Sequence, residues 1–176
     1  MQYVVAKRSI VWGFVFLFVL AIVILVNQFV ISLSVVNGTS MRPTLQNGDR
    51  LLVNKWDLLF GKPHRGDVIT FEDPEEKGRY LVKRVVGVPG DTIEVKNGQL
   101  YRNGKLANEP YIDVSIEDGD FAPVKVLSGT VFVMGDNRHR YASRDSRYQS
   151  VGLVPYGLIS GKVEIILWRP SLSTFL

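Results

Sequence analysis

One uninterrupted apolar run dominates the N-terminal part of the chain. From Ile10 to Val26 the sequence reads IVWGFVFLFVLAIVILV, seventeen residues in which only Gly13 is neither strongly apolar nor alanine. Residues 9–41 carry no charge at all. A helix of seventeen residues is about 26 Å long, so with a few neighbours it matches the hydrocarbon thickness of a bilayer. The pattern predicts a membrane-spanning helix over residues 9–28.

Two other kinds of segment share features of this run. A buried core helix usually keeps some polar face, and this run has none. A cleavable signal peptide is favoured by the basic pair Lys7-Arg8 and by the small residues of Ser32-Leu33-Ser34. However, the apolar region of a signal peptide is usually only about 7–15 residues long. The length therefore favours an uncleaved anchor.

The charges on either side predict how the anchor is oriented. Lys7 and Arg8 precede it, and the next charged residue is Arg42. Because basic residues are retained on the cytoplasmic side of a membrane, we expect residues 1–8 to form a cytoplasmic tail. Residues 29–176 are then extracytoplasmic.

Beyond the apolar run the pattern changes to short alternating segments, which are typical of strands with one buried face. The segments are residues 30–35, 49–55, 67–71, 80–88, 92–107, 129–135 and 161–168. Asn97-Gly98 and Asn103-Gly104 are typical of tight hairpin turns. No segment outside the anchor keeps a helical period. The expected fold class is therefore mainly β, an antiparallel β domain preceded by one transmembrane helix, with residues 92–128 forming a smaller β excursion.

Composition excludes several classes of function. The net charge is +4, but without Lys7 and Arg8 there remain 19 basic residues against 17 acidic ones, interleaved along the chain. We therefore expect no nucleic-acid partner. The chain has no cysteine, which excludes disulfides and thiolate chemistry. The two histidines, His64 and His139, are far apart, so we expect no metal site and no cofactor.

A turn just beyond the anchor offers a candidate nucleophile. The segment VVNGTSMRPTL, residues 35–45, contains Ser40, and a serine hydroxyl needs a base to become nucleophilic. Both histidines lie in highly charged, loop-like segments. The Gly-x-Ser-x-Gly elbow of hydrolases is absent because Met41-Arg42 follows the serine. A Ser-His-Asp enzyme is therefore not favoured.

A lysine is the alternative base. Lys83 lies in YLVKRVVGV, where a period of two places it on the same face as Leu81 and Val85. Apolar surroundings disfavour the ammonium form and lower its pKa. A useful base needs a shift of roughly 2–3 units, or about 3–4 kcal/mol. A lysine that extends to solvent or pairs with a carboxylate is the structural alternative, and spacing alone leaves both open.

A third polar cluster follows the strand at 129–135. The loop MGDNRHRYASRDSRY, residues 134–148, is rich in Gly, Asp, Asn, Arg and Ser. It fits a hydrogen-bonded turn with Asp–Arg pairs, and it equally fits a shell of residues that fixes the geometry of a site.

Four segments, in this order behind a single anchor, resemble the type I signal peptidases, specifically the short single-anchor bacterial form. They are GTSMRPTL (38–45), RGDVITF (65–71), YLVKRVVGVPGD (80–91), and GDNR with SRDSR (135–138 and 143–147). The resemblance covers essentially the whole chain. It implies a membrane-bound serine endopeptidase that removes N-terminal signal peptides from exported preproteins after small residues at −1 and −3. The implied partners are preprotein signal peptides and the lipid bilayer, and we expect a monomer.

The resemblance also implies roles for individual residues. Ser40 would be the nucleophile and Lys83 the general base of an acyl-enzyme mechanism. Ser143 would hydrogen-bond and orient the lysine, while Asp145 and Arg147 would form a supporting ion pair. Two further residues of the same motif are carried over as structural support only, namely Asp136 and Asn137.

Substrate-binding positions follow in the same way. The Ser40 N–H would be an oxyanion donor, and Val36 and Val82 would be pocket walls. Some family members carry a serine as a second oxyanion donor where this chain has Gly38, so that donor is left open, with the hydroxyl of Thr39 as one alternative. The spacing between GDNR and SRDSR is also two residues longer than the family pattern, around residues 140–142.

One apolar segment is expected to lie in a loop between two strands. KWDLLFGKP, residues 55–63, should be a loop that either packs into the core or dips into the membrane through its apolar residues, which are Trp56, Leu58, Leu59 and Phe60. Two other functions are rivals. A self-cleaving regulator of the SOS-repressor kind shares the Ser/Lys pair but is soluble and carries a DNA-binding segment. A non-catalytic, membrane-anchored β domain is the rival from another class.

Overall fold

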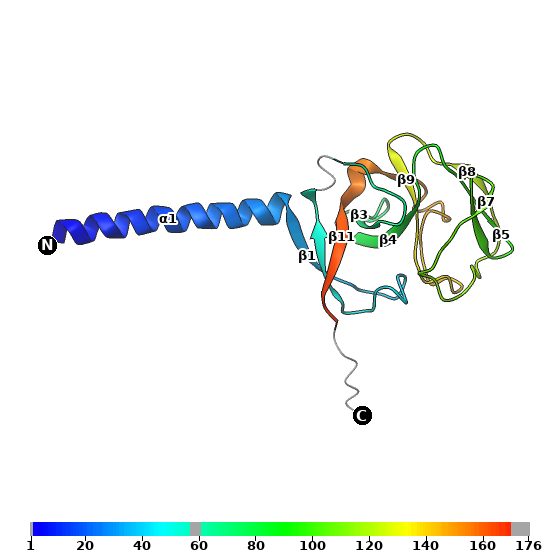
Figure 1. Ribbon diagram of the computed structural model, residues 1–176, viewed down its shortest axis with the longest axis horizontal. Coiled ribbons are helices and arrows are strands. Elements are labelled where there is room, and N and C mark those ends of the chain that lie inside the picture. Colours follow the sequence, from blue (N-terminus) through cyan, green and yellow to red (C-terminus); the bar gives the residue numbers. More distant parts are fainter. Residues whose placement is uncertain (1, 57–60, 170–176) are drawn as a thin grey trace, which may run out of the picture.

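The computed structural model, which describes residues 2–56 and 61–169, contains one long helix followed by two β-sheets (Figure 1). Helix α1 (Gln2–Phe29) projects away from the sheets and leads directly into strand β1 (Ile31–Val35). The Val30 N–H bonds to the Val26 carbonyl at 2.8 Å, and the Val30 carbonyl accepts from Lys55 N–H at 2.8 Å. The expected N-terminal helix is confirmed, and it begins before residue 9.

The presence of helix α1 does not by itself show that it crosses a membrane. Judged on the residues that the structure describes, no helix is both long enough and apolar enough to cross a membrane.

The main sheet is antiparallel and has seven strands in the order β1-β2-β11-β3-β4-β9-β10. Its other members are β2 (Arg50–Asn54), β3 (Val68–Glu72), β4 (Tyr80–Gly87), β9 (Thr130–Met134), β10 (Val154–Pro155) and β11 (Ile159–Trp168). The strand nearest the C-terminus, β11, lies between β2 and β3, with register shifts along both pairings. The sheet thus joins the N-terminal and C-terminal parts of the chain.

A second antiparallel sheet has four strands in the order β7-β6-β5-β8. They are β5 (Thr92–Lys96), β6 (Gln99–Arg102), β7 (Lys105–Leu106) and β8 (Phe121–Lys125), all within the range 92–128 expected for the excursion. Asn97-Gly98 joins β5 to β6 and Asn103-Gly104 joins β6 to β7, with φ between 49° and 74° at all four residues. Positive φ at both central residues is required by a type I′ turn, so both predicted hairpin turns are confirmed.

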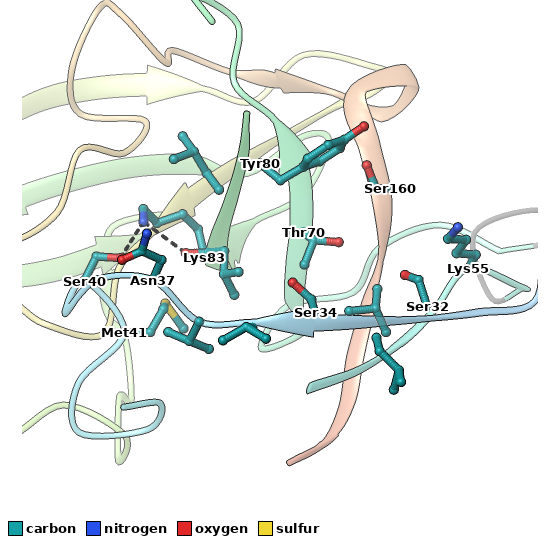
Figure 2. Close-up of a pocket in the computed structure, with 17 residues that line it drawn as sticks. Ser32, Ser34, Asn37, Ser40, Met41, Lys55, Thr70, Tyr80, Lys83 and Ser160 are labelled. Carbon is teal, nitrogen blue, oxygen red and sulfur yellow. Dashed lines mark hydrogen bonds between the residues drawn. The ribbon is translucent and has the colours of Figure 1, made fainter. Parts of the chain in front are cut away.

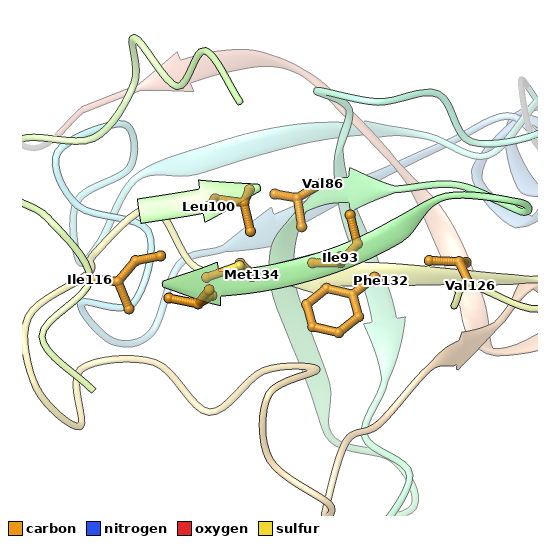
Figure 3. Packing of buried hydrophobic residues seen from close by; sticks show 8 residues of the cluster. Val86, Ile93, Leu100, Ile116, Val126, Phe132 and Met134 are labelled. Atoms are coloured by element: carbon orange, nitrogen blue, oxygen red, sulfur yellow. The ribbon is translucent and has the colours of Figure 1, made fainter. Parts of the chain in front are cut away.

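Three apolar clusters hold the sheets together. One lies between the two sheets and joins residues of β4, β5, β6 and β9 (Figure 3). A second is centred on Phe71 and Val85 of β3 and β4. The third packs Met41 and Leu45 against Leu51 and Val53 of β2. Because this last cluster buries Met41 and Leu45, which lie two positions before and two positions after Pro43 in the Ser40 loop, the core itself fixes that loop.

The strands expected from alternation are all present, and the expectation of a mainly antiparallel β fold is confirmed. Two strands were not predicted, β8 and β10, and a 3-10 turn, η1 (Tyr156–Leu158), precedes β11. Trp56 is 50% exposed. The other apolar residues of its segment, Leu58, Leu59 and Phe60, lie outside the described residues.

Candidate active site

The loop after β1 holds Ser40 in a fixed position. At its start the Val36 N–H donates to the Asp49 carbonyl at 2.9 Å, and the Val36 carbonyl accepts from the Gly48 N–H at 2.8 Å. Met41, directly after the serine, is 2% exposed. The backbone on both sides of Ser40 is therefore fixed by hydrogen bonds and by the core.

Lys83 reaches Ser40 from the edge of β4. Its Nζ donates to Ser40 Oγ at 2.7 Å and to the Val82 carbonyl at 3.0 Å. The residue is 3% exposed and pairs in register with Ile69 of β3. A nucleophile and a candidate base that are 43 residues apart in sequence thus meet at hydrogen-bond distance, which is the arrangement that nucleophilic catalysis requires.

Burial makes Lys83 a stronger candidate base. Loss of hydration lowers the pKa of Lys83 from 10.5 to about 8, while the charges of Asp145 and Asp136 act in the opposite direction and Arg79 adds to the lowering. Burial penalises the ammonium form because a charge in apolar surroundings loses its hydration. At pH 7 roughly one such lysine in ten is then neutral and able to accept a proton.

Ser143 and Asp145 lie behind the lysine in the loop after β9. Asp145 is fully buried and accepts hydrogen bonds from Ser143 Oγ at 2.8 Å and from the Gly135 N–H at 3.1 Å. Arg147 binds the same carboxylate through Nε at 2.9 Å and Nη2 at 3.0 Å. The ion pair implied for these two residues is thus present in the geometry.

The hydrogen bond implied between Ser143 and Lys83 is not formed. The lysine's bonds within the described chain go to Ser40 and Val82, and the Ser143 hydroxyl donates to Asp145 instead. The hydroxyl hydrogen of Ser143 is directed to the carboxylate, which is a strong acceptor, and the Lys83 amine donates to Ser40 and to the Val82 carbonyl rather than to Ser143 Oγ. The influence of this loop on Lys83 is therefore the charge of Asp145 rather than a direct bond.

Asp136 is the second carboxylate whose charge acts on Lys83. Arg84, the residue after the lysine, donates to Asp136 Oδ1 through Nε at 2.8 Å and to Oδ2 through Nη2 at 2.6 Å. The Thr44 hydroxyl also donates to this carboxylate. The guanidinium of Arg84 lies 4.0 Å from the centre of the Tyr111 ring. This arrangement links the Ser40 loop, β4 and the second-sheet region.

Asn137 fixes the peptide groups around the nucleophile. Its N–H donates to the Ser40 carbonyl at 3.0 Å, and its side-chain Nδ2 donates to the Thr39 carbonyl at 3.0 Å. In a trans peptide the C=O and the following N–H point in opposite directions. Because Asn137 holds the Thr39 carbonyl, the Ser40 N–H points away from Asn137. Gly135 allows this close approach, since a Cβ there would clash with Ser40 O and Ser143 Oγ.

A cavity of about 540 Å³ opens beside the Ser40–Lys83 pair (Figure 2). Ser40 and Lys83 lie at one end, and Ser32, Lys55 and Ser160 at the other. β1 forms one wall and the Leu81–Lys83 segment the opposite one. Both residues implied as pocket walls, Val36 and Val82, line the cavity, as do the apolar side chains of Leu33, Val35, Met41, Val53 and Leu81.

Gly38 also lines the cavity and contributes no side chain. Its φ is +123°, and its N–H donates to Asn47 Oδ1 at 2.9 Å. A Cβ at this position would meet open space.

Several residues of this arrangement were not predicted. Arg84 follows Lys83 directly, but nothing in the local pattern indicates that its partner is Asp136, 52 residues away. Glu109 and Asp118 bind the loop of residues 135–148, through Arg138 and Arg147 respectively. Glu109 and Asp118 lie in the acidic segment of residues 107–118. Its charge indicates a basic partner but does not identify which arginine binds there.

Comparisons with known proteins show the family of the chain. The family "Signal peptidase, peptidase S26" matches residues 9–168. A "Signal peptidase I P" of Bacillus subtilis subsp. natto is 42% identical over 172 residues, covering 92% of this chain and 91% of that protein. A "Signal peptidase I" of Bacillus licheniformis is 38% identical over 173 residues, with the same coverage.

Among solved structures, a signal peptidase I from Enterococcus faecalis is 32% identical, with a TM-score of 0.49, and the match covers 58% of this chain and 97% of that one. The family match and the two Bacillus relatives each extend over about nine tenths of the chain. The chain therefore belongs to the signal peptidase family, peptidase S26.

Proposed function

We propose that the protein removes signal peptides from exported preproteins, with Ser40 as nucleophile and Lys83 as general base. The observation that carries this mechanism is the 2.7 Å hydrogen bond between Lys83 Nζ and Ser40 Oγ at the end of a cavity. No histidine takes part, since His64 and His139 pair with Asp67 and Glu117 at other places on the surface.

The first half of the reaction forms an acyl-enzyme. Neutral Lys83 accepts the proton of Ser40 as Oγ attacks the scissile carbonyl carbon, whose oxygen becomes an oxyanion. When this tetrahedral intermediate collapses, the C–N bond breaks and the lysine ammonium gives its proton to the leaving amine. The mature protein departs with a free N-terminus, and the signal peptide remains as an ester on Ser40.

The second half restores the enzyme. Lys83, neutral again, takes a proton from a water molecule that attacks the ester carbonyl, and the proton then passes to Ser40 Oγ as the ester bond breaks. Asp145 and Asp136 support these steps because their negative charges stabilise the lysine ammonium each time it forms.

Two unpaired strand edges provide the place for an extended substrate. β1 pairs only with β2, and within the described chain residues 80–83 of β4 pair only with β3. The same two segments form opposite walls of the cavity. A peptide lying between them would form main-chain hydrogen bonds on both sides. Val36 and Val82 would then limit the side chains at −1 and −3 to small ones.

The domain organisation follows from the same proposal. The apolar run from Ile10 to Val26 supports a membrane anchor in α1, with residues 1–8 cytoplasmic and the catalytic β domain outside. The removed-signal-peptide alternative implies a cut after Ser34, which lies inside β1 and pairs with Leu51. An uncut chain keeps this edge of the cavity.

Cleavage of a preprotein by the detergent-solubilised chain tests the function. Wild type should release the mature product, while Ser40→Ala and Lys83→Ala should each lower kcat by roughly three orders of magnitude or more. Ser128→Ala and Lys105→Ala are matched controls, because both residues are exposed and neither lines the cavity. Full cleavage by either site variant would contradict the proposed mechanism.

A further inference from the structure

The oxyanion formed by attack on the scissile carbonyl needs fixed hydrogen-bond donors. A backbone N–H of the nucleophile is a common first donor, and the Asn137 contacts orient the Ser40 N–H for that role. Serine hydrolases usually add at least one more donor. Gly38 has no side chain to provide it. The identity of the second donor deepens the proposed function and rests on it.

The polar side chains that line the cavity are mostly too far along it. Figure 2 shows Ser32, Lys55 and Ser160 toward the end opposite Ser40, Ser34 and Thr70 between the two ends, and the Tyr80 side chain pointing toward the far end. Lys83 already acts as the general base, so it is not counted as the second oxyanion donor. The Nδ2 of Asn137 is committed to the Thr39 carbonyl and does not line the cavity.

Asn37 meets the requirements that these residues fail. It lines the cavity at the end that holds Ser40 and Lys83 (Figure 2). It is exposed, and its side-chain amide makes no hydrogen bond or ion pair within the part of the chain that the structure describes. Its Nδ2 is therefore available to a substrate atom and would lose no existing partner.

The backbone around Asn37 is held on both sides. The preceding residue, Val36, is fixed through its N–H and its carbonyl to Asp49 and Gly48. The following residue, Gly38, donates its N–H to Asn47 Oδ1 at 2.9 Å. A donor is effective in catalysis when its position is set before the charge develops, because no reorganisation is then required. The backbone of Asn37 is positioned in this way by the hydrogen bonds of Val36 and Gly38.

We propose that the side-chain amide of Asn37 is the second oxyanion donor of this enzyme. As Ser40 Oγ bonds to the carbonyl carbon, the Asn37 Nδ2–H and the Ser40 N–H share the negative charge on the carbonyl oxygen. The amide is neutral and transfers no proton, so proton transfer remains with Lys83. This donor acts on the transition state more than on the bound substrate, since the charge appears only then.

Steady-state kinetics of the full-length protein with a preprotein test the assignment. Asn37→Ala and Asn37→Asp should each lower kcat by roughly 10²–10³-fold, as expected for loss of one oxyanion donor, with KM changing less than about threefold. Asp keeps the shape of Asn but replaces the donor with an anionic acceptor. Asn108→Ala, an exposed asparagine away from the cavity, is the matched control and should keep wild-type kcat.

A peptide boronic acid with alanine at its reactive end gives a second readout. It forms a tetrahedral adduct with the serine, so its affinity should fall in the Asn37 variants by about the same factor as kcat/KM. The affinity of the corresponding uncleaved peptide for Ser40→Ala should be unchanged when Asn37→Ala is added.

The possible results separate the two proposals. Wild-type kcat in Asn37→Ala, or a raised KM at unchanged kcat, would overturn the role of Asn37 and leave the Ser40–Lys83 mechanism intact. An inactive wild-type protein would overturn the proposed function itself. Because Asn37 is exposed and makes no contact of this kind, the variants should unfold at the wild-type temperature, and a lower temperature would also count against the assignment.

Discussion

At the scale of single residues, the protonation of Lys83 governs the chemistry. Burial places its pKa near pH 8, and only the neutral amine can accept the Ser40 proton. We therefore expect kcat/KM to rise about tenfold per pH unit below pH 8 and to level off above it. A profile that is flat between pH 5 and 9 would exclude a lysine base.

A charge variant checks that this profile belongs to Lys83. Asp145 raises the pKa of the lysine through its negative charge, so Asp145→Asn should move the midpoint of the profile to lower pH. Arg147, which keeps only its pair with Asp118, then acts in the same direction. Glu94→Gln, at a surface pair with Lys96, is the control and should leave the midpoint unchanged. A midpoint that stays in place in Asp145→Asn would contradict the assignment.

Asn137 makes a second residue-scale prediction. Its two bonds hold the carbonyls on either side of the Ser40 N–H, so Asn137→Ala should misplace both the nucleophile and that donor. Misplacement of this kind can cost about 10²-fold. We expect a lower kcat with a nearly unchanged KM. An increase in KM alone would mean that Asn137 affects substrate binding rather than the geometry of the turn.

At the scale of elements, the second-sheet region supports the catalytic loop. Residues 107–118, between β7 and β8, direct two carboxylates at the loop of residues 135–148. Glu109 binds Arg138 at 2.6 Å and 3.0 Å, and Asp118 Oδ2 lies 2.9 Å from Arg147 Nη1. Arg138 is fully buried. Residues 107–118 therefore stabilise the loop that contains Ser143 and Asp145.

Removal of one carboxylate tests how much these ion pairs stabilise the loop. Glu109→Ala leaves a buried guanidinium without its partner, which typically costs about 3–5 kcal/mol of unfolding free energy. Glu75→Ala breaks an exposed pair with Arg144 and should cost at most about 1 kcal/mol. Chemical denaturation measures both values. Equal losses in the two variants would mean that the Glu109 pair does not stabilise the loop.

The elements differ in how far the sequence predicted them. Strands such as residues 92–96 alternate clearly, and Asn-Gly pairs favour a tight turn, so local pattern was sufficient. β8 was missed because FAPVK contains a proline and no alternation, and β10 because it has only two residues. Ser40 and Lys83 became a pair through family resemblance. Their contact, and those of Arg84 with Asp136, depend on long-range pairing that no local pattern encodes.

At the scale of the whole molecule, apolar surface continues from α1 onto the β domain. Leu33 of β1 is 72% exposed, and Ile165 and Trp168 of β11 are 54% and 63% exposed. Trp56 adds another exposed aromatic side chain next to this surface. Aromatic residues favour the boundary between lipid and water. We infer that this side of the β domain faces the membrane and that the cavity opens near the lipid surface.

Anchoring should matter for membrane-bound substrates and not for the chemistry itself. A variant that begins at residue 30 keeps β1 and every residue that lines the cavity. For a short soluble peptide, its kcat/KM should therefore stay within about threefold of that of the full chain. For a preprotein held in the same vesicles as the full-length enzyme, the rate should fall by roughly 10²–10⁴-fold, since the proposed anchor would confine enzyme and substrate to one surface. An equal loss on both substrates would mean that α1 supports the active site structurally, and no loss on either would remove anchoring from the mechanism.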